Sequence, residues 1–268
     1  DGSLEFAMSN SPPLSRMSQS PSPSPSFLFR KKPPTSPSAA VSSAEDRSES
    51  IVGEIFGGVL QSRLICHECR NVSITRDKFL DLSLSIPADN RVPDIQREWQ
   101  SDPSYGVDAS PPPAGPGFLT RLLVGMNLLS GEVLLKDCMK DFCLKEELTG
   151  SEQARCERCN KYTESHKTFN ITCLPEIMVI HLKRFRYDYD YCEKVGIHVT
   201  YKMEMDMGPY YGCRRSAGLG NDVGMHERIP YRLIGVIVHE GLAGGGHYIA
   251  YCLNRTTGEW FMFSDSRV

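Results

Sequence analysis

Two pairs of cysteines have the spacing of a metal site, Cys66-x-x-Cys69 and Cys156-x-x-Cys159. Each pair can present two thiolates from one tight turn to a tetrahedral zinc ion, and together they close its coordination shell. His67 is therefore not needed as a ligand. The stretch between the pairs is too long for a compact zinc ribbon, so a larger fold must bring them together. We predict one structural zinc ion; the alternatives are buried cysteines or a redox dithiol.

A histidine behind three glycines offers a second kind of chemistry. His247 follows residues 244–246 directly and begins an apolar stretch with the composition of a strand. Glycines let another backbone approach closely, so an extended peptide could lie beside this histidine and meet a general base. A hydrogen-bonding residue on the next predicted strand, 260–263, can fix the tautomer of that base. Since a lone histidine is more often structural, the surrounding sequence decides between the two interpretations.

The elements that must position these groups are mainly strands. Apolar and polar residues alternate over 80–86, which is the period of a half-buried strand. Apolar residues at i, i+3, i+4 and i+7 from Leu135 to Phe142 predict a short amphipathic helix that ends at Thr149-Gly150. Further strands are predicted over 169–173, 177–182, 231–238, 248–252 and 260–263, and the glycine-rich stretch 205–227 is predicted to be a loop.

Two stretches have the composition of disordered chain. Residues 1–50 are rich in serine and proline and hold few apolar side chains that could form a core. Residues 87–118 have the same character and include three consecutive prolines. So long a structureless stretch inside a domain is normally an insertion. We therefore predict a disordered segment over 1–50 and a disordered insertion over 87–118.

Composition excludes several classes of protein. The 268 residues carry a formal net charge of -3, which does not favour nucleic-acid binding. The sequence shows neither an apolar leader nor an apolar run near the roughly 20 residues that a membrane-spanning helix needs. The ten cysteines are therefore expected to be reduced thiols rather than disulfides. We expect a protein of the cytosol or the nucleus, with neither nucleic acid nor membrane as a partner.

Several stretches resemble, in the same order, the motifs of the ubiquitin-specific proteases, which are papain-like deubiquitinases. The resemblance covers roughly residues 51–268 apart from the insertions. It rests on the two cysteine pairs and on Ile55-Phe56-Gly57-Gly58, Phe79-Leu80-Asp81-Leu82-Ser83-Leu84, the run from Leu174 to Phe185, and Gly246-His247-Tyr248-Ile249-Ala250-Tyr251. So many ordered motifs are unlikely to coincide by chance.

The resemblance implies an α+β, papain-like right-hand fold that is mainly antiparallel β. Residues 51–268 would be part of the catalytic domain, with a zinc-binding fingers region over about 60–86 and 145–173 and a palm over 174–268. The implied activity is thiol-dependent hydrolysis of the isopeptide bond at the C-terminal glycine of ubiquitin. Ubiquitin and ubiquitinated proteins would then be the partners, and zinc would only support the structure.

The resemblance also assigns roles to residues around the histidine box. His247 matches the catalytic histidine, whereas His181 and His239 do not. The residue after Phe263 is usually Asp or Asn in the family but is serine here. Either Ser264 or Asp265 can therefore orient His247, and we place Ser264 slightly ahead. Gly245, Gly246 and Tyr248 are the predicted substrate-binding residues.

One family motif is missing from the sequence. The Asn-x-x-x-x-Cys box that carries the nucleophile is absent, and none of the ten cysteines has its context. We therefore expect this chain alone to be inactive, although the complete protein would be an enzyme. The alternative function is a non-catalytic ubiquitin-binding zinc module, or a truncated pseudoenzyme.

Overall fold

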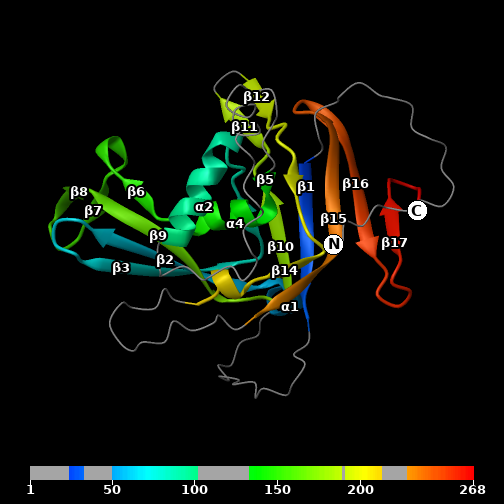
Figure 1. The fold of residues 1–268 in the computed structure, drawn as a ribbon, viewed down its shortest axis with the longest axis horizontal. Coiled ribbons are helices and arrows are strands. Elements are labelled where there is room, and N and C mark those ends of the chain that lie inside the picture. Colours follow the sequence, from blue (N-terminus) through cyan, green and yellow to red (C-terminus); the bar gives the residue numbers. More distant parts are fainter. Residues whose placement is uncertain (1–23, 33–49, 102–132, 189–190, 213–227) are drawn as a thin grey trace, which may run out of the picture.

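A seven-stranded sheet, here called the palm sheet, forms the centre of the computed structural model, which describes residues 24–32, 50–101, 133–188, 191–212 and 228–268. Its strand order is β17-β16-β15-β1-β10-β4, and β14 also pairs with β15 (Figure 1). All neighbours are antiparallel except β10 and β4. The strands span Ser24–Lys31 (β1), Leu82–Leu84 (β4), Ile177–Leu182 (β10), Glu204–Asp206 (β14), Pro230–Leu242 (β15), Gly245–Leu253 (β16) and Trp260–Phe263 (β17).

A second sheet, here called the finger sheet, extends to one side of the palm sheet (Figure 1). Its strand order is β3-β2-β9-β6, and every pair is antiparallel. A short hairpin, β7 and β8, lies beside its outer end (Figure 1). The strands span Gly58–Cys66 (β2), Val72–Phe79 (β3), Glu146–Leu148 (β6), Ala154–Cys156 (β7), Lys161–Thr163 (β8) and Ser165–Cys173 (β9).

Two helices pack on the palm sheet and on each other, α2 (Val92–Ser101) and α4 (Leu135–Cys143). Their buried side chains join one core with the inward-facing residues of β1, β4, β10 and β15. Burial of this apolar surface is the main force that holds the palm together. The remaining described elements are α1 (Ile51–Phe56), the pair β11 (Phe185–Asp188) and β12 (Tyr191–Lys194), the pair β5 (Val133–Leu134) and β13 (Val199–Thr200), and three short 3-10 turns over 89–91, 150–152 and 208–210.

The preponderance of antiparallel strands, with few helices, confirms the predicted α+β class. The alternation over 80–86 also has the expected result, since Leu82, Leu84 and Ile86 are buried. Leu80, in contrast, is half exposed and lies before the strand. In the described part of the chain, no helix is long and apolar enough to cross a membrane.

The prediction that residues 1–50 are disordered is wrong for 24–32. Strand β1 lies in the middle of the palm sheet, hydrogen-bonded to β10 on one side and to β15 on the other. Phe27 and Phe29 are fully buried, whereas Leu28, on the opposite face, is only partly buried. Pairing on both edges and burial of two phenylalanines outweigh the polar composition of the neighbouring chain. Residues 1–23 and 33–49 lie outside the described residues.

The predicted disordered insertion 87–118 is wrong in its first half. A 3-10 turn at 89–91 leads into α2, where Val92, Ile95 and Trp99 are buried. Their i, i+3, i+7 spacing is a helical signal that the proline-rich and polar surroundings obscured. Residues 102–118 lie outside the described residues.

Two smaller boundaries also differ from the prediction. The helix that begins at Leu135 ends at Cys143 rather than at Thr149-Gly150, because Leu144 leaves the helical conformation and its N–H closes the last turn. Residues 146–148 then form β6. Within the predicted loop 205–227, β14 and a 3-10 turn cover 205–210, and residues 213–227 lie outside the described residues.

Because Phe29 has no exposed surface and packs in the main core, Phe29→Ala is expected to lower the free energy of unfolding by about 3–5 kcal/mol. Leu28→Ala, one residue away on the opposite face, is the matched control and should cost clearly less. Urea unfolding followed by circular dichroism measures both. Equal midpoints for wild type and Phe29→Ala would mean that β1 does not belong to the stable core.

Candidate metal centre and histidine site

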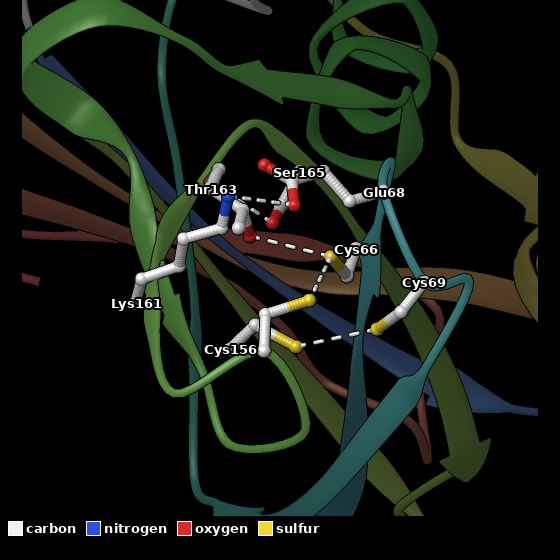
Figure 2. Close-up of polar contacts among 8 residues, drawn as sticks. Cys66, Glu68, Cys69, Cys156, Lys161, Thr163 and Ser165 are labelled. Carbon is white, nitrogen blue, oxygen red and sulfur yellow. Dashed lines mark hydrogen bonds and ion pairs between the residues drawn. The ribbon is translucent and has the colours of Figure 1, made fainter.

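The structure brings the four predicted cysteine ligands together at the outer end of the finger sheet (Figure 2). The Sγ atoms of Cys66 and Cys159 are 3.9 Å apart, and those of Cys69 and Cys156 are 3.5 Å apart. All four sulfurs lie within 4.8 Å of one another. A tetrahedron with metal–sulfur bonds of about 2.3 Å has edges of about 3.8 Å. The cluster therefore has the size and the donor set of a four-cysteine metal site.

The two cysteine pairs are held by similar turns. Cys66 ends β2 and Cys156 ends β7, and each second cysteine is followed by a residue with positive φ, Arg70 at 58° and Asn160 at 54°. This left-handed residue lets the chain reverse directly after the pair, so that both thiols of a pair point to the same side. The two turns face each other, which explains how pairs so distant in sequence meet.

Hydrogen bonds lower the pKa of one of the four thiols, that of Cys66. The backbone N–H of Cys69 and then the Thr163 hydroxyl lower the pKa of Cys66 to about 6 (Figure 2). The Cys69 thiol, followed by burial, instead raises the pKa of Cys159 to about 12. Protons are thus distributed unequally over four crowded sulfurs, as expected where negative charges would otherwise gather. A divalent cation would relieve this repulsion, so the cluster can hold a metal ion.

His247 lies on β16, opposite Glu240 of β15, and β16 lies on the side of the palm sheet away from the finger sheet (Figure 1). Its Nε2 is 2.8 Å from the Ser264 hydroxyl, and its Nδ1 is 3.9 Å from Oδ2 of Asp265. Ser264 directly follows β17, and Asp265 is the first residue of a two-residue turn that is closed by reciprocal hydrogen bonds between the backbones of Ser264 and Arg267. Ser264 is thus the residue in direct contact. Asp265 is farther away, and its side chain is 86% exposed.

The glycines before His247 have distinct surroundings, although the sequence presents them as one run. Gly246 packs against the His239 ring, and a Cβ there would lie 2.1 Å from the Glu240 carbonyl oxygen and 2.4 Å from Nε2 of His239. At Gly244 and Gly245, nothing lies within 4 Å of such a carbon. Only Gly246 is therefore required by close packing.

His239 packs against Gly246 at the start of β16. It is buried, its ring centroid is 4.7 Å from that of Tyr248, and burial followed by the nearby Lys194 ammonium lowers its pKa. Lys194 on β12 also donates to the carbonyl oxygens of His239 (2.9 Å) and Gly241 (2.8 Å). The structure thus places His239 as a packing residue beneath the glycines. Tyr248 itself is 62% exposed.

Replacing Gly246 by alanine is expected to displace the start of β16, because the added carbon meets backbone as well as the His239 ring. We expect a loss of about 1–3 kcal/mol of stability and a shift of the His247 imidazole. Gly244→Ala, where the space is open, is the matched control and should change little. Thermal unfolding and the NMR shift of the His247 ring protons measure the two effects. Indistinguishable behaviour of the two variants would contradict the packing argument.

Within the described part of the chain, the polar contacts of His247 are with Ser264 and Asp265, and they include no cysteine and no other histidine. His181 contacts Ser26 of β1. A second cluster, in which His67 and His166 meet Glu147 beside the cysteines, is not predictable from the sequence motifs. No spacing signal in the sequence marks it, because its members come from two separate strands, β6 and β9, and from the turn after β2.

Comparisons with known proteins agree with this architecture. The family model for ubiquitin carboxyl-terminal hydrolases matches residues 13–268. Ubiquitin carboxyl-terminal hydrolase 22-A of Xenopus laevis is 29% identical over 221 residues, which cover 81% of this chain and 39% of that protein. The chain thus spans well under half the length of this curated relative.

Solved structures give the same result. The SAGA Ubp8/Sgf11/Sus1/Sgf73 DUB module bound to ubiquitin aldehyde matches with a TM-score of 0.55 and 26% identity, covering 81% of this chain and 38% of that one. A yeast SAGA DUB module with an Sgf73 mutant matches with a TM-score of 0.56 and 27% identity, covering 82% and 38%. Fold, ordered motifs and family match agree, and the chain belongs to the ubiquitin carboxyl-terminal hydrolase family.

Proposed function

We propose that the protein is a deubiquitinase, a thiol-dependent hydrolase of the bond between the C-terminal glycine of ubiquitin and a lysine amine. The observation that carries the proposal is the 2.8 Å contact between His247 Nε2 and the Ser264 hydroxyl, in a chain of this family. Solved relatives were determined as modules bound to ubiquitin aldehyde or to monoubiquitin, which supports ubiquitin as the substrate.

The contact gives the two imidazole nitrogens of His247 different tasks. With Nε2–H donating to Ser264, the lone pair lies on Nδ1, which can accept a proton from a thiol. The thiolate attacks the glycine carbonyl, and the imidazolium then returns the proton to the leaving lysine amine. Water, deprotonated by the same nitrogen, releases ubiquitin from the thioester. The nucleophile is a cysteine of the Asn-x-x-x-x-Cys box, which this chain does not contain.

Asp265 has a weaker, electrostatic task in this proposal. Its carboxylate faces Nδ1 at 3.9 Å, so it attracts the imidazolium that forms after proton transfer. Since the side chain is largely exposed, water screens the attraction. Ser264 therefore orients the ring, and Asp265 adds little.

The proposed cofactor is one structural zinc ion on Cys66, Cys69, Cys156 and Cys159. The residues fit it, because all four donors are thiols at the spacing of a closed tetrahedron. A closed shell leaves no position for substrate or water. When bound, the ion would join the turn after β2 to the β7–β8 hairpin and keep the finger sheet ordered, whereas the reaction itself uses His247.

The exposed glycines and Tyr248 are proposed to receive the C-terminal tail of ubiquitin. Gly245 and Gly246 are exposed on β16 directly before His247, and Tyr248 is exposed beside them. An extended tail can lie against this strand because nothing projects from the glycines.

Release of a fluorescent reporter from the C terminus of ubiquitin tests the proposal. A protein that joins this chain to a segment carrying the cysteine box is expected to release the reporter, whereas the 268-residue chain alone is not, because a base without a nucleophile forms no acyl intermediate. Turnover by the chain alone would show that one of its ten cysteines is the nucleophile. Ubiquitin binding without turnover by the complete protein would favour a non-catalytic ubiquitin-binding module.

A further inference from the structure

Beside the cysteine cluster, three further side chains converge at the spacing of metal ligands. Nε2 of His67 lies 3.0 Å from Nδ1 of His166 and 3.3 Å from Oε2 of Glu147. These three atoms all lie within 4.8 Å of one another. Bonds of about 2.0–2.1 Å to a tetrahedral zinc ion would place neighbouring ligand atoms about 3.3–3.4 Å apart. The two short contacts are close to that value.

The register of the finger sheet explains why the side chains of His67, Glu147 and His166 converge. Glu147 of β6 stands directly opposite His166 of β9, and His166 stands opposite Ile65 of β2. Residues opposite each other share a face of the sheet, and so do residues two apart on one strand. His67 follows Ile65 by two and is anchored by its N–H to the Glu164 carbonyl at 3.0 Å. Two facing positions of the sheet and a residue of the adjoining turn therefore direct their side chains to one point.

A residue outside the cluster, Lys145, also orients the Glu147 carboxylate. Lys145 contacts Oε1 of Glu147 at 2.5 Å, which leaves Oε2 to face His67. Although burial raises the pKa of Glu147, the hydrogen bond and charge of Lys145 outweigh it and the pKa is lowered overall. A supporting partner of this kind is typical of the outer shell of metal sites. The nearby ammonium also weakens the attraction of a cation, so any ion should exchange readily.

We propose that His67, Glu147 and His166 form a second, exchangeable binding site for a divalent transition metal such as zinc, separate from the four-cysteine site. Two imidazoles and one carboxylate are the donor set that borderline ions of this class prefer, whereas calcium and magnesium prefer oxygen donors alone. Three protein ligands leave at least one position open to water. The half-exposed side chains of His67 (31%) and Glu147 (45%) give the ion access from solvent.

Such an ion would add a link between side chains of β6, β9 and the turn after β2 to the backbone pairing already present at this end. Strand β6 has three residues and pairs only with β9 among the described strands. A ligand from β6, a ligand from β9 and the turn after β2 would become one unit. We therefore expect zinc above the amount that fills the cysteine site to stabilise the fingers, since an ion that binds only the folded state shifts unfolding by mass action.

Counting bound zinc tests the proposal. The complete protein is dialysed to equilibrium against a fixed concentration of free zinc, and the zinc bound per chain is obtained from the difference between the two compartments. We expect His166→Gln and Glu147→Gln each to bind one zinc ion fewer than wild type. His198→Gln, which changes an exposed histidine outside the cluster, should keep the wild-type count. An undiminished count in both cluster variants would overturn the proposal.

A spectroscopic titration distinguishes the two sites even if a variant folds poorly. Cobalt(II) is added to wild-type protein whose cysteine site already holds zinc. Binding at the second site is expected to produce visible d–d bands without thiolate-to-cobalt charge transfer in the near ultraviolet, because its ligands contain no sulfur. Calcium should not compete with cobalt, whereas zinc should. No visible bands, or bands with thiolate character, would contradict the assignment.

Discussion

Replacing His247 with alanine in the complete protein is expected to lower kcat/KM for a ubiquitin reporter by at least about 10³-fold. Among the described residues, His247 is the only histidine in contact with Ser264, and the proton transfers of the proposed reaction pass through its ring. The loss should appear mainly in kcat, since the exposed glycines that would hold the ubiquitin tail remain in place. Steady-state kinetics with a fluorogenic ubiquitin conjugate provide the measurement.

Two milder variants test the geometry around that histidine. Ser264→Ala removes the acceptor of a 2.8 Å hydrogen bond, which is worth about 1 kcal/mol, so a loss of about five- to tenfold is expected. Asp265→Asn removes a largely exposed charge at 3.9 Å and should cost at most a few-fold. Asparagine is the suitable replacement because residue 265 has a φ of 50°, which asparagine tolerates. A larger loss for Asp265→Asn than for Ser264→Ala would reverse the two roles.

Loss of one cysteine of the metal cluster should have the largest effect on stability. Cys156→Ser removes a buried thiol whose sulfur lies 3.5 Å from that of Cys69. Structural zinc contributes about 10–16 kcal/mol of apparent folding free energy in small domains at neutral pH, and even a fraction of that would unfold the fingers. We expect loss of thiolate-bound metal and rapid proteolysis between residues 58 and 79 and between 146 and 173.

The control for that experiment is Cys252→Ser, which changes an exposed cysteine on β16 of the palm sheet. It should retain the wild-type metal content and the wild-type digestion pattern. Cobalt(II) charge-transfer absorption reports specifically on thiolate ligands, so it monitors this site independently of the histidine cluster. A folded, protease-resistant Cys156→Ser protein with unchanged thiolate bands would refute the four-cysteine assignment.

The chemistry-bearing motifs were predictable because they are short and local. A tight turn that presents two thiols needs only the spacing seen at Cys66 and Cys69, and the box around His247 is continuous in sequence. The buried helix α2 was also readable, since Val92, Ile95 and Trp99 keep helical spacing. It was missed because composition was given more weight than periodicity, although burial on one face is what decides whether a helix forms.

Only the tertiary structure decided which distant strands lie side by side and in which register. The local sequence around Phe27 and Phe29 does not show that β1 lies between β10 and β15. The position of a strand in a sheet depends on which other strands have unpaired edges and on which apolar face it must cover. The convergence of Glu147 and His166 with His67 likewise follows from sheet register alone. The sequence by itself therefore determined the ligand types and the catalytic histidine expected here, whereas the pairing of strands set the β1 position, the second cluster and the close contact of Ser264 with that histidine.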